Sequence, residues 1–165
     1  MNAAMWGFIG TIVGACVSIL TAWLSINSNR LVQETKAKEE RQERANTFQR
    51  DTLLEMQQSV HDVLKLVHRA YIEDCKSLHE GTPWQKAKLS DELNESVRLA
   101  LSKVSILVER IADDEVRLEV KTLTSIASQA MHARSESEAR EHLEHSQVEG
   151  IRVFESLGRA LRAKY

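Results

Sequence analysis

The residues best suited to bind a ligand are arginines near the C-terminus. They are Arg134, Arg140, Arg152, Arg159 and Arg162. The planar guanidinium fork of arginine matches the oxygen atoms of a phosphate group. When several copies of a chain assemble symmetrically, a few such side chains become a ring around the axis. This pattern predicts a site for an anionic ligand, such as a cyclic nucleotide, between subunits. The alternative is structural, because cations near a helix C-terminus also complement the helix dipole.

Histidines, cysteines and acidic residues form no catalytic or metal-binding motif. His142 and His145 lie one helical turn apart, but the Glu-x-x-His motif that carboxylate-bridged bundles carry on two helices is absent. The chain also lacks His-Glu-x-x-His, a Gly-rich phosphate loop and Gly-x-Ser-x-Gly. Cys75 and His79 lie four residues apart without a third group to orient them. We therefore expect no enzyme activity, no catalytic residue, no metal site and no cofactor.

The overall charge argues against a nucleic-acid-binding protein. The chain has 22 Lys and Arg residues and 24 Asp and Glu residues, which gives a formal net charge of −2. Without a continuous basic face, double-stranded nucleic acid is not an expected partner. The two cysteines, Cys16 and Cys75, are far apart in the sequence and indicate no disulfide framework. A reducing compartment suits such a chain.

An uncharged stretch near the N-terminus predicts a membrane anchor. Residues Ala3 to Ile26 contain no charged side chain, and a helix of this length crosses a hydrocarbon core of about 30 Å. Trp6 and Trp23 lie near its two ends, where indole rings prefer the headgroup layer. One alternative is a cleaved signal peptide, which would begin with basic residues and end at a small-residue cleavage site. The other is a buried helix of a soluble protein. We expect a retained single-span anchor over residues 1–29.

The charges that follow this stretch predict its orientation. Lysine and arginine are retained on the cytoplasmic side of a bacterial inner membrane. Basic residues follow the predicted span and none precedes it; they are Arg30, Lys36, Lys38, Arg41 and Arg44. We therefore expect the N-terminus outside, the C-terminal domain in the cytoplasm and membrane lipid as a partner. Residues 30–47 are rich in helix formers of both charges and are expected to form a solvated helical stalk.

Small residues recur along one side of the predicted span. They are Gly7, Gly10, Gly14, Ser18 and Ala22. In lipid, small residues let two helix backbones approach closely. The stripe therefore predicts that the spans associate and that the protein is a homo-oligomer. The alternative is that small residues are simply frequent in membrane helices.

After residue 47 the apolar period of helices returns. Apolar residues recur every three to four positions in four stretches. These stretches are 48–78, 89–111, 116–131 and 143–161. Phe48 in the first stretch and Ile151 in the last are expected on buried faces. Residues 48–165 are thus predicted to form an antiparallel bundle of about four helices, and the whole chain is expected to be all-α.

Residues between the four stretches have side chains that end or begin helices. Gly81 fits the position just after a helix C-terminus. The second helix has two alternative starts, Thr82-Pro83-Trp84-Gln85 and Ser90. The acidic run Asp113-Asp114-Glu115 is expected to open the third helix, and the capping box Ser135-Glu136-Ser137-Glu138 the fourth.

The second stretch has the widest apolar face. Leu99, Ile106 and Leu107 widen the row that contains Leu101 and Val104. A helix that is apolar over much of its circumference is usually buried. We therefore expect this helix at the centre of the bundle, with Leu101 and Val104 as core positions.

The order of a short anchor and a compact helical domain resembles a group of small bacterial membrane proteins, several of which are effectors in antiphage defence. In order and size the chain is most similar to the membrane effector of some type III CRISPR systems. That resemblance implies a cytoplasmic oligomer that binds a cyclic oligoadenylate and perturbs the bilayer. We expect a non-enzymatic membrane effector whose oligomeric bundle senses a signal. The alternatives are a membrane-anchored adaptor for a protein partner and a phage spanin-like lysis protein, which would need a periplasmic C-terminal domain.

Overall fold

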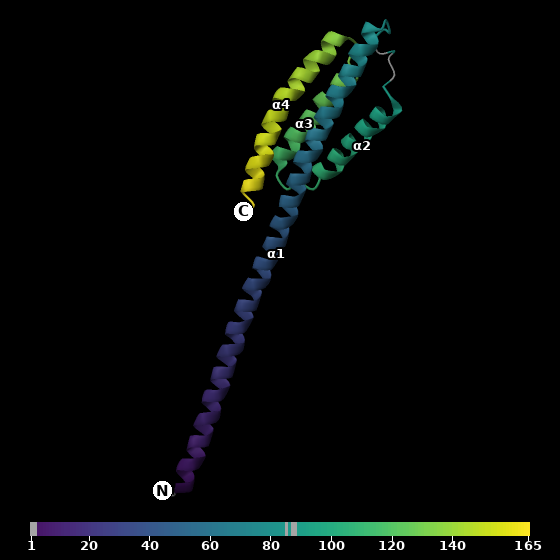
Figure 1. Ribbon diagram of the computed structural model, residues 1–165. Helices are drawn as coiled ribbons and strands as arrows, with labels where there is room; N and C mark the ends of the chain where they lie inside the picture. Colours follow the sequence, from purple (N-terminus) through teal and green to yellow (C-terminus); the bar gives the residue numbers. More distant parts are fainter. Residues whose placement is uncertain (1–2, 85, 87–88) are drawn as a thin grey trace. The chain divides into compact units, whose positions relative to one another are not determined.

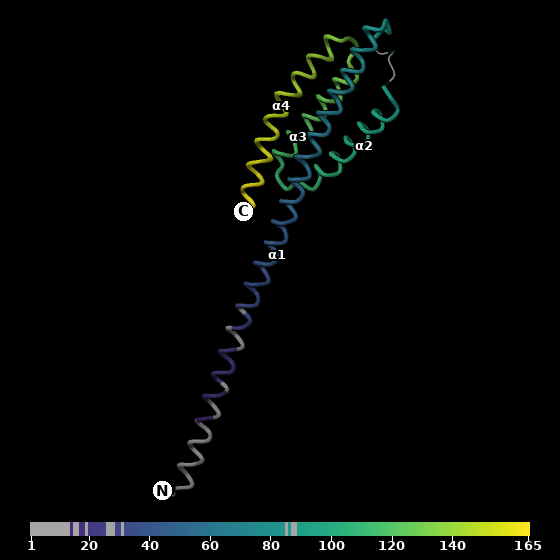
Figure 2. Tube along the Cα trace, in the orientation of Figure 1, coloured from purple at the N-terminus to yellow at the C-terminus, as the bar shows by residue number. Residues whose placement is uncertain are grey.

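The computed structural model of the chain describes residues 3–84, 86 and 89–165, without the side chains of 3–13, 15, 16, 19, 26–28 and 31. Figure 2 draws the uncertain residues in grey. The described residues form four helices and no strand. The helices are α1 (Ala3–His79), α2 (Asp91–Val108), α3 (Asp114–Met131) and α4 (Glu136–Arg162), labelled in Figure 1. The prediction of an all-α chain is confirmed.

The chain divides into two units, which are described separately. Unit 1 comprises Met1–Ala45 and unit 2 comprises Asn46–Tyr165. The described backbone of unit 1 is the first part of α1. Unit 2 contains the rest of α1 together with α2, α3 and α4. The division of residues 1–47 into an anchor and a stalk stays a prediction.

The structure gives no support for the predicted membrane span over residues 1–29. Within the part of the chain that is described, no helix is both long and apolar enough to cross a bilayer. Trp6 of that prediction, and Gly7 and Gly10 of the predicted small-residue stripe, lie outside the residues whose side chains are described.

Unit 2 is a four-helix bundle around one main core. Consecutive helices run antiparallel and are joined by short connections (Figure 1). Each helix contributes fully buried apolar side chains, as its sequence period predicts. They include Met56 and Val60 of α1, Val104 of α2, Val120 and Leu123 of α3, and Leu157 of α4. Removing each such side chain from water favours folding by about 1.5–3 kcal/mol before the loss of conformational entropy is counted.

The predicted helix starts and one predicted helix end are confirmed. Ser90, Asp113 and Ser135 each accept a hydrogen bond at the side-chain oxygen from the backbone N–H three residues later, at 3.3, 3.1 and 3.2 Å. These bonds satisfy N–H groups that have no partner within the helix. Ser90, rather than the segment that begins at Thr82, therefore opens the second helix. Gly81 follows α1 with a φ of 90°, a left-handed conformation that glycine adopts without strain.

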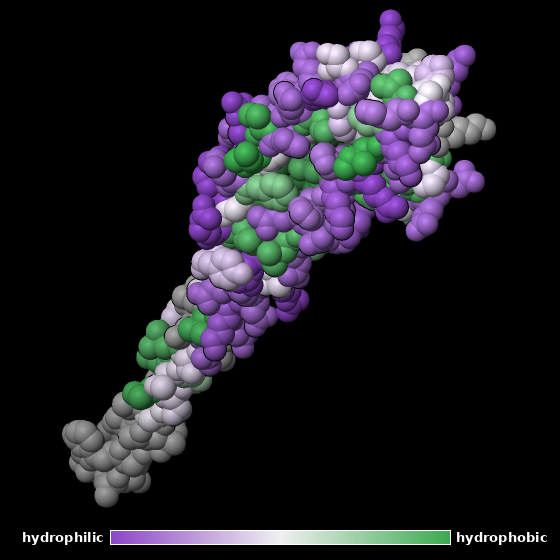
Figure 3. Space-filling model, turned by 45° about the horizontal axis from the view of Figure 1, so that its top comes forward, coloured by the Kyte–Doolittle hydropathy of each residue, from purple (hydrophilic) through white to green (hydrophobic). Residues whose placement is uncertain are grey.

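The prediction that the second helix is central is wrong. Val104 and Leu107 are buried, as expected, but Leu99 and Ile106 are 55% and 56% exposed. Leu101, predicted as a core position, is only half-buried. One side of α2 packs against the other helices. No helix among the described residues covers its opposite side. Apolar side chains on that side therefore remain at the surface of unit 2, where Figure 3 shows hydrophobic patches among hydrophilic residues.

Two other apolar residues expected on buried faces are exposed. Phe48 is 52% exposed and Ile151 is 64% exposed. The buried row of α4 has the predicted helical period, and it includes Leu143, Ser146, Gly150, Val153 and Leu157. Because successive residues turn by about 100° around a helix, Ile151 points away from the row that contains its neighbour Gly150.

Candidate functional site

The five arginines predicted to bind an anion lie on α4 or just before it. Arg134 precedes the helix, and the other four are distributed along it. All five side chains are exposed. Arg140 and Arg159 are separated along the helix axis by about 28 Å, at 1.5 Å per residue. A single copy of the chain therefore does not bring the five arginines together in one pocket, and the ring between subunits stays a prediction.

Three of these arginines are bound by neighbouring side chains of α4. Arg140 donates to the carboxylate of Glu136 at 2.9 Å, and Arg152 donates to that of Glu149 at 2.8 Å. Arg159 donates to the hydroxyl of a serine three residues earlier at 2.8 Å. Exposed ion pairs of this kind are worth about 0–1 kcal/mol. An anion that binds several arginines at once could therefore replace these partners.

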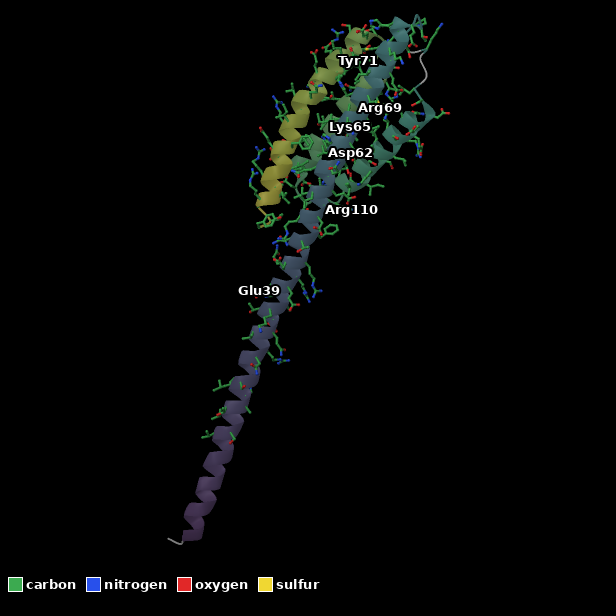
Figure 4. The ribbon with its side chains drawn as sticks, in the orientation of Figure 1. Glu39, Asp62, Lys65, Arg69, Tyr71 and Arg110 are labelled. Atoms are coloured by element: carbon green, nitrogen blue, oxygen red, sulfur yellow. The ribbon has the colours of Figure 1, made fainter. Side chains whose placement is uncertain are left out.

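Arg140 also links α4 to the last part of α1. Its Nε donates to the Tyr71 hydroxyl at 3.4 Å, and Tyr71 is labelled on α1 in Figure 4. The bond from Arg140 lowers the pKa of Tyr71, but the adjacent Cys75 thiol and partial burial outweigh it and leave that pKa above its ordinary value. The same bond raises the pKa of Arg140. At neutral pH the tyrosine is therefore neutral and the arginine charged, and the contact connects two helices.

Trp84 fastens the connection between α1 and α2 to the rest of the bundle. Its indole Nε1 donates to the carbonyl oxygen of Ala133, between α3 and α4, at 3.0 Å. Its ring lies 6.2 Å from that of Tyr71, tilted by 58°, in the range where aromatic pairs attract. The cavity that remains beside these rings is only about 10 Å³. This cluster is therefore a structural contact with no room for a ligand. Sequence reasoning placed Trp84 at a helix start and missed the contact.

At the other end of the bundle, Gln49 bridges α1 and the connection between α2 and α3. Its Nε2 donates to the Arg110 carbonyl at 2.9 Å, and its Oε1 accepts from the Ala112 N–H at 3.0 Å. A groove of about 230 Å³ lies beside it, with Asp113 and Lys164 among its lining residues. Ligand pockets are usually about 300–1,000 Å³. The groove is smaller than this usual range. Its charged lining residues are one acid and one base, Asp113 and Lys164, so it does not favour an anionic ligand.

Titratable side chains in the described part of the chain form no metal site. No group of three or more His, Cys, Asp or Glu residues there is placed to hold a metal ion. His145 lies 3.9 Å from Glu149, and His79 forms a hydrogen bond at 2.8 Å with a carbonyl of its own helix. Burial, with the nearby Glu73 charge, raises the pKa of the Asp74 carboxyl. None of these groups forms a nucleophile–base pair with a third orienting residue.

The described side chains of the predicted span present an apolar surface. Val17, Leu20, Trp23 and Leu24 are between 56% and 62% exposed. Two hydroxyl side chains among them form hydrogen bonds with backbone carbonyls of the same helix. The Ser18 hydroxyl donates to the Gly14 carbonyl at 2.9 Å, and the Thr21 hydroxyl donates to the Val17 carbonyl at 2.8 Å. This segment therefore exposes apolar side chains, while the hydroxyl hydrogens of Ser18 and Thr21 are bonded to its own backbone.

Part of the predicted small-residue stripe lies in this same segment. Gly14, Ser18 and Ala22 are exposed. A Cβ added at Gly14 would meet nothing within 4 Å. The stripe is thus open to a neighbouring helix in the part that is described, and its role in self-association stays a prediction.

No protein-family model, no curated protein and no solved structure matches this chain.

Proposed function

We propose that this protein is a non-enzymatic, single-pass membrane protein anchored by residues 3–26. The supporting observation is the uncharged run, in whose described part four large apolar side chains are more than half exposed. Water disfavours such a surface by about 25 cal/mol per Å² of apolar area, whereas lipid accepts it. Ser18 and Thr21 donate to carbonyls of their own helix, which is how hydroxyl groups are commonly satisfied in the absence of water.

The anchor places residues 30–165 in the cytoplasm, with the N-terminus outside a bacterial inner membrane. The supporting pattern is the group of basic residues directly after the uncharged run. In this orientation, alkaline phosphatase fused after Tyr165 is inactive and a fluorescent protein fused there is bright. An active phosphatase fusion with a dark fluorescent fusion would refute the orientation.

The bundle acts in this proposal as an oligomeric sensor that alters the packing of the spans and perturbs the membrane. α1 carries the uncharged run and also contributes Met56 and Val60 to the bundle core, so the two parts share one helix in sequence. A ligand can shift the spans only by its difference in affinity for two arrangements of the protein. The exposed arginines of α4 suit an anionic ligand such as a cyclic nucleotide.

The effector proposal is tested with the purified full chain in dye-loaded vesicles and with its expression in bacteria. Cyclic oligoadenylate is the probe in the vesicle experiment, and a chain lacking residues 1–28 is the comparison. Dye release or growth arrest that requires both the probe and the anchor is the expected result. Activity that is retained without residues 1–28 would refute the effector and favour the adaptor.

The adaptor has one observation of its own in support. Leu99 and Ile106 lie seven residues apart on the outward side of α2, and both are more than half exposed. A pair of apolar residues on one helix face is a usual anchor for a protein partner. If the protein is an adaptor, Ile106→Ser leaves the folding of the bundle unchanged and abolishes partner capture. Removal of the anchor preserves partner binding.

A further inference from the structure

Two separate apolar clusters hold α2 in the bundle. Its second half contributes to the main core, which all four helices share, the buried side chains of Val104, Leu107 and Val108. Its first half belongs to a second, smaller core, whose buried members among the described residues are Ala70 of α1 and Leu93 and Val97 of α2. Leu101 is partly buried and packs against both cores. The apolar packing of α2 therefore changes from one core to the other near Leu101.

Polar contacts divide α2 near the same place. In its second half, Lys103 pairs with Glu55 of α1 at 3.0 Å. Just after its end, Glu109 pairs with Lys121 of α3 at 2.7 Å. In the described part of the chain, the side chains of residues 91–101 form hydrogen bonds and ion pairs only with other residues of α2 itself. Apolar contacts alone therefore hold this first half against the other helices.

The beginning of α2 is also incompletely packed against the end of α1. A groove of about 360 Å³ lies between them, with Ser77 of α1 on one side and Leu89 and Ser90 on the other. Leu89 packs against the second core and is only partly buried. Solvent therefore reaches the edge of the second core beside Leu89, whereas the main core is enclosed by four helices.

Trp84 fixes the connection that leads into α2. Its Nε1 donates to the Ala133 carbonyl at 3.0 Å, and its ring lies 6.2 Å from that of Tyr71, which Figure 4 labels on α1. Both partners belong to other parts of the bundle. Since Trp84 precedes the first residue of α2 by seven positions, these two contacts restrain the first half of α2 from outside that helix.

We propose that residues 91–101 form a lid that opens from α1 as a unit while the main core stays packed, and that Trp84 is its latch. Opening uncovers Leu93 and Val97 and leaves the main-core contacts of α1, α3 and α4 in place. Segments that bury few apolar side chains open at a lower free energy than the whole fold. The lid is therefore expected to open more often than the bundle unfolds.

The lid gives the bundle two arrangements that a signal can shift. A ligand that binds one arrangement more tightly than the other changes the balance between them. This use of the lid rests on the proposed function, because it makes the lid part of the sensor. The opening itself is a property of the bundle and requires neither the anchor nor a ligand.

Thiol labelling of the purified full chain in detergent measures how often each core opens. Cys16→Ala and Cys75→Ala first remove the native thiols. Val97→Cys then places one thiol in the second core, and Val153→Cys places one in the main core as the matched control; these valines are 3% and 1% exposed. The thiol at position 97 is expected to react with iodoacetamide at least about tenfold faster than that at position 153. Equal rates would overturn the lid.

A substitution in the main core shows whether the lid opens separately. Leu123→Ala weakens the main core and is expected to speed labelling at position 153 on the order of tenfold or more, with the rate at position 97 unchanged. Low concentrations of urea make the same distinction without a core substitution, because urea favours large openings more than small ones. Equal acceleration at both positions would mean that the bundle opens as one unit, and the lid would be refuted.

Trp84→Phe tests the latch. It keeps an aromatic ring beside Tyr71 but removes the donor to Ala133, and it is expected to speed labelling at position 97 about fivefold. An unchanged rate there would overturn the role of Trp84. Membrane and ligand binding are not measured in this assay, so a failure of the proposed function leaves the result on the lid unaffected.

Discussion

The close approach of Gly150 in α4 to Leu64 in α1 permits a quantitative test of how the bundle is packed. Gly150 lies on the buried row of α4, and a Cβ added to it would lie 2.9 Å from Cδ1 of Leu64. Replacing glycine by alanine inside a helix favours folding by about 1 kcal/mol. Against this, Leu64 must turn away from the new methyl group, and an off-rotamer side chain costs about 0.5–1.5 kcal/mol. We expect the two effects to cancel, so Gly150→Ala changes the free energy of unfolding very little.

The cancellation disappears when the obstructing side chain is removed. In a Leu64→Ala background, Gly150→Ala has no side-chain atom to displace and is expected to stabilise the bundle by about 1 kcal/mol. Gly158→Ala is the matched control in the same helix, because its Cβ would meet Arg162 at an ordinary contact distance of 3.5 Å. That substitution is expected to stabilise the bundle by about 0.5–1 kcal/mol in either background.

Urea denaturation of a chain comprising residues 46–165, followed by circular dichroism, measures these differences. Unit 2 has its own core, so we expect this chain to unfold cooperatively. The double-mutant cycle should give an interaction energy near 1 kcal/mol between positions 64 and 150. If Gly150→Ala stabilises the wild-type bundle as much as Gly158→Ala does, or if the interaction energy is below about 0.3 kcal/mol, the close approach of the two helices is refuted.

Three further substitutions test other contacts of the bundle. Gln49→Ala removes both hydrogen bonds to the α2–α3 connection and is expected to cost about 1–2 kcal/mol in urea denaturation, whereas the exposed Gln58→Ala should change stability by less than about 0.5 kcal/mol. Trp84→Phe keeps an aromatic ring but loses the bond to Ala133, which should cost about 1 kcal/mol in the same assay. Because burial raises the pKa of Asp74, its charge opposes folding at neutral pH. Asp74→Asn is therefore expected to raise the melting temperature at pH 7 and to lose that advantage below about pH 4, where the carboxyl is protonated in both states.

The candidate site illustrates the limit of predicting function from residue types. The sequence predicted arginines of α4 as candidate ligands for an anion, and the structure shows their side chains exposed on the polar side of this amphipathic helix. They are spread along the helix, so one copy of the chain does not gather them into one pocket. Their role as ligands stays a prediction. The hydrogen bond between Arg140 and Tyr71 could not be anticipated. It joins residues 69 positions apart, and only the packing of α4 on α1 brings them together.

Local features of this chain were determined by the sequence itself. The hydrophobic period set the helices, and Ser90, Asp113 and Ser135 set their starts, because a capping side chain bonds a backbone N–H only three residues away. Gly81 likewise set the end of α1 within the bundle, since a left-handed residue needs no tertiary partner. Such interactions form within one or two turns of chain and do not depend on the rest of the fold.

Tertiary structure alone decided which part of each apolar face is buried. Leu99 and Ile106 lie about 140° and 160° around α2 from the buried Val104, and they remain exposed because no other helix of the described chain covers that side of α2. The same holds for the indole of Trp84 and the amide of Gln49, whose partners lie 49 residues away or more. Burial is a property of two surfaces in contact, and a sequence period describes only one of them.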